Sequence, residues 1–160
     1  MERLPDKNPG QGQLELLAGL RNAKLASAYR YVPWHSAGAN TLAWLKKSLT
    51  SGDIERASFV HIGPLYGGPK GGRLDMQFKL KNAVLDYVPG WPVLSGLDAT
   101  VDITGQRLTV RGERGNILSA QAKNLLADIP DLHRPVLSIN ADLALDLTDV
   151  DKLLAESPLK

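Results

Sequence analysis

The sequence predicts a mainly β protein of the α+β class, with antiparallel strands in one sheet and two short helices. Apolar and polar residues alternate along several segments, which is the period-two pattern of strands with one buried face. Helical spacing of apolar residues occurs in only two short segments. One stretch of sequence occurs twice, sixty residues apart, and repetition at a long fixed period is typical of arrays whose units complete one another's cores.

The repeated stretch covers residues 12–25 and 72–85, which align without gaps. The matching positions are Leu14, Glu15, Leu16, Leu20, Arg21, Asn22, Ala23 and Leu25 in the first copy, and Leu74, Asp75, Met76, Leu80, Lys81, Asn82, Ala83 and Leu85 in the second. We therefore predict one continuous structural unit, with the end of one repeat and a bracing helix in 1–70. The next repeat and the start of the following helix are expected in 71–160, so that both ends of the sequence are cuts in a longer array.

Two helices are predicted, at 41–49 and 148–154, and they resemble each other weakly. In the first, Leu42 and Leu45 recur at helical spacing, and Gly52 is expected to end the helix in a left-handed conformation. The second begins with a threonine that is suited to cap a helix, with an aspartate three positions later.

The strands are predicted from alternation. Residues 73–81 alternate without a break, and the apolar phase then changes near Asn82, which indicates a turn or bulge because a slip of one residue exchanges the two faces of a strand. Residues 97–103 and 108–110 alternate on either side of a Thr-Gly-Gln turn, which predicts a hairpin. Residues 137–145 predict a further half-buried strand.

The composition excludes several classes of protein. The 160 residues carry a net charge of +2 with both signs interspersed, whereas nucleic-acid-binding domains usually have a clustered basic face. There is no cysteine, which excludes disulfides and thiolate metal sites. The N-terminal residues lack the apolar region of a signal peptide, and no run approaches the roughly 18 apolar residues that span a bilayer. Any export signal or membrane anchor is therefore expected outside this sequence.

No pattern of catalytic, metal-binding or cofactor-binding residues is found. Lys70 lies in a glycine-rich loop, but a strand follows it, whereas a phosphate-binding loop leads into a helix. The three histidines are far apart in sequence, and His61 falls in a predicted strand, 57–62. Carboxylates such as Asp98 and Asp102 fall on the polar faces of strands, and no serine or cysteine nucleophile motif occurs. We predict a protein that is not an enzyme and that binds neither a metal ion nor a cofactor.

The apolar strand faces are the positive signal for function. A sheet whose apolar face is incompletely covered must pair with another unit, close on itself or bind an apolar ligand. A closed core covered by the two helices explains the alternation equally well. Trp91, held between Gly90 and Pro92, is expected at a corner of the sheet, where its indole plugs the end of an apolar trough.

Nearly the whole chain resembles the YhdP branch of the AsmA-like proteins of Gram-negative bacteria. The shared pattern includes a hairpin strand at 107–112, a Gly-Asn-Ile-Leu strand at 115–118 and a Ser-Pro-Leu segment at 157–159. The motif residues expected to be structural are Tyr87, Pro89, Gly90, Trp91, Pro92, Ile129, Pro130 and Asp131. One segment departs from the pattern, because Tyr-Gly-Gly-Pro-Lys stands at 66–70 where the family has an aromatic, proline-containing segment. The loop before Gly72 is therefore expected to differ in shape.

The resemblance implies a large protein that is anchored in the inner membrane and extends through the periplasm. Such proteins look like repeating-β-groove proteins, in which a long curved antiparallel sheet forms an open groove or half-barrel and phospholipids move along it between the two membranes. On this basis we expect ten apolar residues to line the groove or to form its packed base: Leu74, Met76, Phe78, Leu80, Leu97, Val101, Ile103, Leu137, Ile139 and Leu143.

Two functions are open at this point. The first is that of an internal periplasmic segment that mediates phospholipid transport between the inner and outer membranes. The alternative is a non-catalytic structural spacer or protein-interaction module of the cell envelope, with its apolar faces fully buried. The expected partners are phospholipid or another acyl-chain ligand and the neighbouring repeats of the same chain, without nucleic acid. An edge-to-edge dimer of the segment is a further expectation, because free strand edges pair readily.

Overall fold

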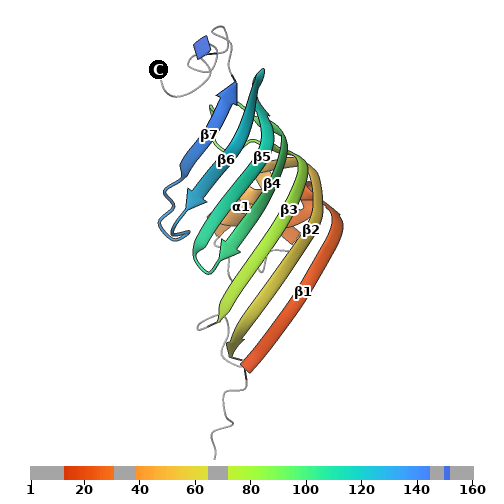
Figure 1. Cartoon of the computed structure of the whole chain (residues 1–160). Coiled ribbons are helices and arrows are strands. Elements are labelled where there is room, and N and C mark those ends of the chain that lie inside the picture. Colours follow the sequence, from red (N-terminus) through yellow and green to blue (C-terminus); the bar gives the residue numbers. More distant parts are fainter. Residues whose placement is uncertain (1–12, 31–38, 65–71, 145–149, 152–160) are drawn as a thin grey trace, which may run out of the picture.

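A single antiparallel sheet forms the body of the protein (Figure 1). The computed structural model describes residues 13–30, 39–64, 72–144 and 150–151. Within these ranges each strand pairs with its neighbour in sequence, in the order β1-β2-β3-β4-β5-β6-β7, so that β1 and β7 are the two edges. The antiparallel pairing of all seven strands confirms the prediction of a mainly β protein with one antiparallel sheet. The sheet is open among the described strands, because β1 and β7 do not pair with each other, and this argues against a closed core.

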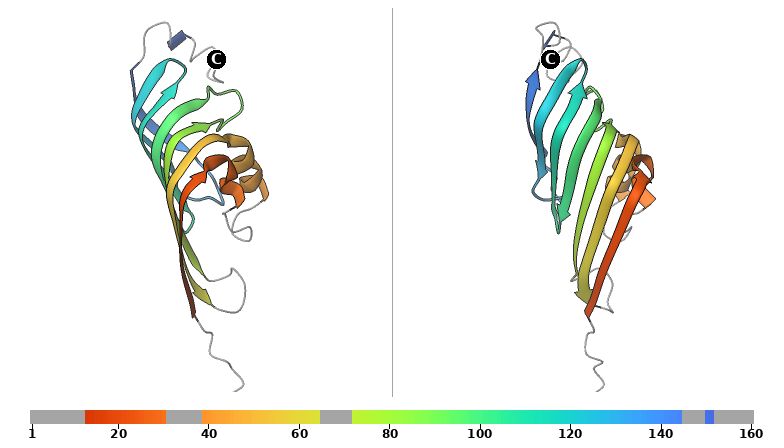
Figure 2. Two further views of the ribbon diagram at one scale, coloured as in Figure 1. Left: turned by 90° about the vertical axis from the view of Figure 1, so that its right-hand side faces the viewer. Right: turned by 45° about the vertical axis from the view of Figure 1, so that its right-hand side comes forward.

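The strands are long and the helices few. The strands are β1 (Gln13–Lys24), β2 (Leu49–Pro64), β3 (Arg73–Leu85), β4 (Leu94–Thr104), β5 (Arg107–Ile117), β6 (Ala120–Ile129) and β7 (Ser138–Ala144). Between β1 and β2 the chain forms a 3-10 helix, η1 (Leu25–Arg30), and the helix α1 (Ala39–Ser48). Both contact β2 and lie on one face of the sheet near β1 to β3, behind the sheet in Figure 1 and to its right in the left panel of Figure 2.

Most of the predicted elements are present. The helix predicted at 41–49 is α1, which begins two residues earlier and ends at Ser48. The helix predicted at 148–154 falls largely outside the described residues, of which 150 and 151 have helical backbone. The glycine-rich loop with Lys70 also lies outside the described residues. No helix among the described residues is long and apolar enough to cross a membrane.

The change of apolar phase in β3 is produced by a left-handed residue. Asn82 has a φ of 51°, and the register with β4 shifts between Leu80 and Ala83. The predicted bulge is therefore confirmed. The hairpin between β4 and β5 is confirmed as well, because Gly105 turns the chain with a φ of 57°.

The two copies of the repeated stretch form β1 and β3, and the same asparagine is left-handed in both. Asn22 in β1 has a φ of 54°, and Asn82 in β3 has a φ of 51°. Asn124 in β6 adopts the same conformation, with a φ of 51°. Asparagine tolerates this conformation better than most residues, because its short side chain bonds to the local backbone.

The predicted role of Gly52 is wrong. Gly52 does not end α1 but lies inside β2, where it has a φ of 116°. A Cβ at this position would lie 2.6 Å from the Cα of Ala83 and 2.9 Å from the carbonyl oxygen of Asn82, both on β3. The glycine is required because two backbones approach each other closely beside a bulge, and not because a helix stops there.

Replacing Gly52 with Ala is expected to lower the free energy of unfolding by about 2–3 kcal/mol, because it adds a backbone clash to a strained conformation. Chemical denaturation measures the loss. Gly105→Ala is the matched control, since Gly105 also has a positive φ but no atom lies within 4 Å of the place that an added Cβ would take. The control is expected to cost about 1 kcal/mol, for the conformation alone. Equal losses for the two variants would contradict the close approach.

Asp98 on β4 holds the β3 bulge. The backbone N–H of Asn82 donates to Asp98 Oδ1 at 2.8 Å, and Arg114 Nε lies 2.7 Å from Asp98 Oδ2. The bond from Asn82, followed by the bond and charge of Arg114, holds the pKa of Asp98 below its ordinary value. A depressed pKa stabilises the folded state above the unfolded-state pKa of 3.8, and this contribution disappears as the pH falls through the folded-state pKa.

The variant Asp98→Asn is therefore expected to be less stable than the parent chain at pH 7, and the difference between the two is expected to shrink as the pH falls below 3.8. Urea denaturation of both proteins between pH 7 and pH 3 measures this difference. A difference that stays constant over this range would contradict the assigned role of the carboxylate.

The buried core lies on the face of the sheet that carries the helices. Its most deeply buried side chains include Ile54 of β2 and Leu97 of β4, both at 0 % exposure. The ring of Phe59 meets that of Phe78 edge-on, with centroids 5.6 Å apart, which joins β2 to β3. The packed part of the face is therefore centred on the inner strands.

Candidate functional site

The candidate functional site is the apolar face of the sheet. Residues that pair directly across antiparallel strands point to the same face, so the strand registers define it. One row crosses the whole sheet from β1 to β7 and contains only apolar residues: Leu20, Ala57, Phe78, Val101, Val110, Ala127 and Ile139. The apolar face is thus continuous from one edge of the sheet to the other.

Neighbouring rows of the apolar face have the same character. One of them runs from β1 to β6 through Ala18, Phe59, Met76, Ile103, Leu108 and Ile129. Another runs through Ala23, Ile54, Leu80, Ala99, Gly112 and Leu125. Nearer the β2–β3 loop, His61 pairs with Leu16 and Leu74. His61 is the one ionisable side chain that we find in these rows of the apolar face among the described strands.

Burial divides the ten predicted site residues into three groups. Met76, Phe78, Leu80 and Leu97 are buried, and they form the packed centre of the apolar face. Leu74, Val101 and Ile103 are half-buried. Leu137, Ile139 and Leu143 are exposed in or just before the edge strand β7. All of them except Leu137, which precedes β7, lie on paired positions of the apolar face.

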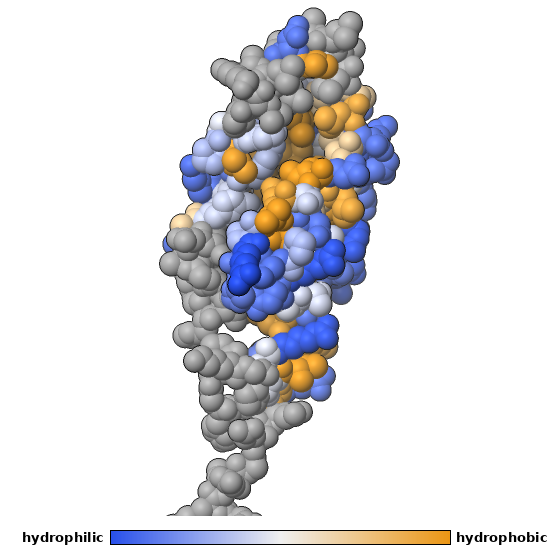
Figure 3. Space-filling model, turned by 90° about the vertical axis from the view of Figure 1, so that its left-hand side faces the viewer, coloured by the Kyte–Doolittle hydropathy of each residue, from blue (hydrophilic) through white to orange (hydrophobic). Residues whose placement is uncertain are grey.

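The exposed apolar residues gather at the two edges of the apolar face. At the β1 edge these are Leu14 and Leu16, and at the β7 edge they are Ile139 and Leu143. Figure 3 views the molecule from the side that carries β7, and hydrophobic residues cluster there beside a border of hydrophilic ones. Apolar surface that reaches a sheet edge is available to another strand or to an apolar ligand.

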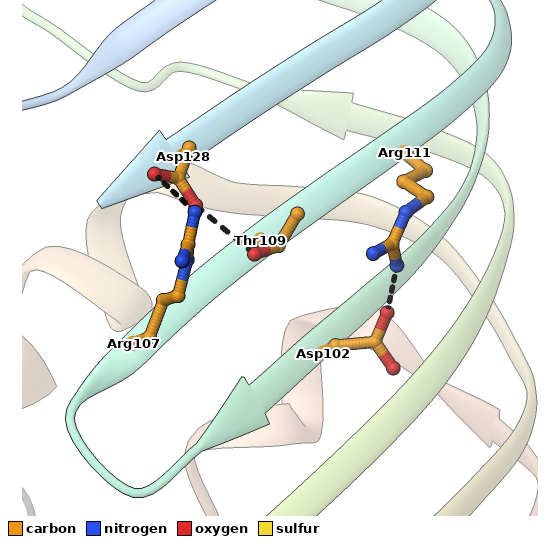
Figure 4. Close-up of polar contacts among 5 residues, drawn as sticks. All are labelled: Asp102, Arg107, Thr109, Arg111 and Asp128. Carbon is orange, nitrogen blue, oxygen red and sulfur yellow. Dashed lines mark hydrogen bonds and ion pairs between the residues drawn. The ribbon is translucent and has the colours of Figure 1, made fainter. Parts of the chain in front are cut away.

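The opposite face is polar and its charges are paired across strands. Arg107 of β5 binds Asp128 of β6 through Nε at 2.8 Å and through a terminal nitrogen at 3.1 Å, and Thr109 donates to the same carboxylate (Figure 4). Arg111 pairs with Asp102, which also accepts a bond of 2.8 Å from Gln77. The bond from Arg107 is the main cause that lowers the pKa of Asp128.

Two shallow hollows lie on the polar side, one of about 840 Å³ over β3 to β6 and one of about 400 Å³ beside Gly52. The larger hollow contains the carboxylates Asp102 and Asp128 together with the arginines that neutralise them. Paired charges of this kind hold a sheet surface in register and keep it solvated. Asp102 therefore lies on the polar face, as the alternation of its strand predicted.

The motif at residues 87–92, which follows β3, connects the sheet to α1. Trp44 of α1 donates from Nε1 to the carbonyl oxygen of Tyr87 at 2.9 Å, and Trp91 donates its backbone N–H to the carbonyl oxygen of Val88 at 3.1 Å. Gly90 has a φ of 82°, and Pro92 is buried. Burial raises the pKa of the Tyr87 phenol. The sequence pattern does not predict the hydrogen bond of Trp44, because the spacing of residues along a helix does not show which distant carbonyl oxygen an indole N–H will reach.

The second motif, Ile129-Pro-Asp, forms the exit from β6. Ile129 is the last residue of β6, and Pro130 is exposed. The carboxylate of Asp131 accepts a hydrogen bond from the backbone N–H of His133 at 2.9 Å. The backbone carbonyl oxygen of Asp131 accepts one from the backbone N–H of Arg134 at 3.1 Å. Both motifs therefore have a structural explanation in turns.

No metal site is found in the part of the chain that the structure describes. No group of three or more histidine or acidic side chains within those residues is placed so that it could hold a metal ion. What the apolar face offers chemically is a surface on which the apolar part of another molecule can be removed from water.

Comparison with known proteins agrees with the resemblance. The family model described as YhdP protein matches residues 3–160. The chain belongs to the YhdP family. A curated member of this family, the intermembrane phospholipid transporter YhdP of Escherichia coli (strain K12), is 29% identical over 150 residues. The match covers 92% of this chain but only 12% of the relative, so the chain spans about an eighth of that protein's length. No solved structure matches the chain.

Proposed function

We propose that this chain is an internal segment of a periplasmic protein that transports phospholipids between the inner and outer membranes, and that its apolar face holds their acyl chains. The observation that carries the proposal is the row of seven apolar residues that crosses all seven strands. The E. coli member of the family bears the name of a phospholipid transporter, which supports the same assignment.

The energetics favour acyl chains as ligand. Each methylene group that leaves water contributes roughly 0.8 kcal/mol, so a few methylenes on an apolar strip bind without any specific hydrogen bond. The exposed rim provided by Leu14 and Leu16 at one edge, and by Ile139 and Leu143 at the other, supplies such surface. Transport between membranes also requires many sites of similar affinity, because one deep pocket would trap the lipid.

We further propose a groove built from repeats. The packed base of the groove is formed by Met76, Phe78, Leu80 and Leu97, and its lining by Leu74, Val101, Ile103, Leu137, Ile139 and Leu143. The division into repeats at 1–70 and 71–160 is supported by the two aligned stretches, which form β1 and β3 with the same left-handed asparagine. Adjoining repeats of the longer protein continue the groove, and its membrane anchor belongs to that longer protein.

A structural spacer is the second candidate. The burial of Met76, Phe78 and Leu80 within the described chain favours it, because these side chains already have their packing partners. A structural spacer has no need of exposed apolar residues at the edges of its sheet. The 53% exposure of Ile139, on the edge strand β7, therefore counts against a spacer. The proposed segment has no catalytic role in either case.

Native mass spectrometry of the chain, purified without detergent from a Gram-negative host, tests the proposal. The expected spectrum contains protein with one or more bound phospholipids, identified by their masses after release. A spectrum of unliganded protein alone, with no phospholipid in an organic extract of the same sample, would support the spacer.

A further inference from the structure

His61 of β2 places a polar side chain on the apolar face. Its row crosses β1 to β3 only, because the pairing of β3 with β4 begins at Asp75, and these three strands extend below the others in Figure 1. β2 is an interior strand, so a further strand beyond β1 would leave His61 on this face. The side chain is half-buried, and among the described residues its imidazole makes no hydrogen bond or ion pair. The ring is therefore a polar group that lacks a protein partner in apolar surroundings.

Two glycines leave room for this ring. Gly63 of β2 lies beside Gly72, which precedes β3, and a Cβ added to Gly63 would lie 2.7 Å from the Cα of Gly72. A Cβ added to Gly72 would lie 2.6 Å from Cε1 of His61, and one added to Gly63 would lie 3.1 Å from its Nε2. The imidazole thus lies over the two glycines, and its cross-strand neighbours are Leu16 and Leu74.

His61 offers a hydrogen-bond donor in either protonation state, because a neutral imidazole carries one N–H and a protonated imidazole carries two. A phospholipid on the apolar face would present two kinds of acceptor, its ester oxygens and its phosphate oxygens. The phosphate is the stronger acceptor, because hydrogen bonds to a charged group are about twice as strong as neutral ones. The half-buried position of His61 also leaves a phosphate there in contact with water, which a charged group requires.

We propose that the imidazole of His61 donates a hydrogen bond to the phosphate of a phospholipid bound on the apolar face. The proposal rests on the proposed function and adds an orientation to it. With its phosphate at His61, the lipid extends its acyl chains away from the β2–β3 loop, over the rows that contain Phe59 and Phe78. If His61 merely filled the space above the two glycines, an apolar side chain of similar size would serve equally well.

A comparison of two lipids that differ only in the phosphate tests the proposal. Dioctanoyl phosphatidic acid and dioctanoylglycerol are titrated into the lipid-free 160-residue chain, and native mass spectrometry measures both affinities. The variant His61→Leu is expected to bind the phosphatidic acid about tenfold more weakly, because it loses a hydrogen bond to a charged group. Its affinity for dioctanoylglycerol is expected to stay unchanged. His61→Gln is expected to retain most of the affinity for phosphatidic acid, since its amide also donates.

His133→Leu is the matched control, because His133 is an exposed histidine in the connection between β6 and β7. It is expected to leave both affinities unchanged, and thermal denaturation verifies that each variant is folded. If the parent chain binds neither lipid, the proposed function fails and this inference fails with it. If the parent binds both lipids and His61→Leu weakens neither, or weakens both equally, the contact between His61 and the phosphate alone is overturned.

Discussion

Replacing Ile139 with Asp is expected to abolish phospholipid binding while the chain stays folded. Ile139 lies at the β7 end of the row of seven apolar residues and is 53% exposed, so the carboxylate can reach water in the lipid-free protein. With an acyl chain in place, the same carboxylate would lose its water. The cost of desolvating a charge is large compared with the roughly 0.8 kcal/mol gained per methylene, so a loss of at least about tenfold in bound lipid is expected.

The matched control is Leu126→Asp. Leu126 is 44% exposed and lies on β6, on the opposite face, where it pairs with Arg111 and Asn140. Both substitutions place a carboxylate on a partly exposed strand position, and each is expected to cost about 1 kcal/mol of stability or less. Lipid extraction and thermal denaturation of both variants separate binding from folding. Equal loss of lipid in both variants, or unfolding of the Ile139 variant alone, would contradict the account.

Replacing Leu97 with Ala is expected to produce the largest loss of stability among these variants, about 3 kcal/mol. Leu97 is fully buried, and its Cδ1 would lie 3.1 Å from a Cβ added to Gly112 and 3.5 Å from one added to Gly115. The leucine thus occupies the space that these two glycines of β5 leave open. For a chain of this size the loss corresponds to a decrease of about 9 °C in Tm.

Differential scanning calorimetry measures this decrease, with Leu126→Ala as the control for loss of an exposed leucine. The control is expected to change Tm by about 2 °C or less. A loss at Leu97 as small as that of the control would show that the centre of the apolar face is open and unpacked, which contradicts the assignment of Leu97 to the base of the groove.

Local patterns predicted the strands well. The alternation in β3 and the bulge at Asn82 are both properties of a few consecutive residues, because the apolar phase records which way each side chain points. The hairpin at Gly105 is local in the same sense. β2 was predicted at only about a third of its length, since shifts of register near Gly52 and between Ile54 and Arg56 break its alternation.

The site was harder to predict than the strands. Alternation identifies the apolar residues of β3 and β7 equally well, yet Phe78 is buried and Ile139 is exposed. The difference depends on the place of each strand in the sheet and on which neighbours cover it, and neither is encoded in the sequence of the strand itself. The role of Gly52 was mistaken for the same reason, because the backbone that approaches it belongs to β3.

Photo-cross-linking on the two faces tests the central claim most directly. A benzophenone amino acid is placed at Ile139 on the apolar face, or at Leu126 on the polar face, in chains produced in a Gram-negative host, and the irradiated proteins are weighed intact. An added mass equal to a phospholipid is expected at position 139 and none at position 126. Absence of a phospholipid adduct at 139, or equal adducts at both positions, would contradict the claim that the apolar face carries lipid.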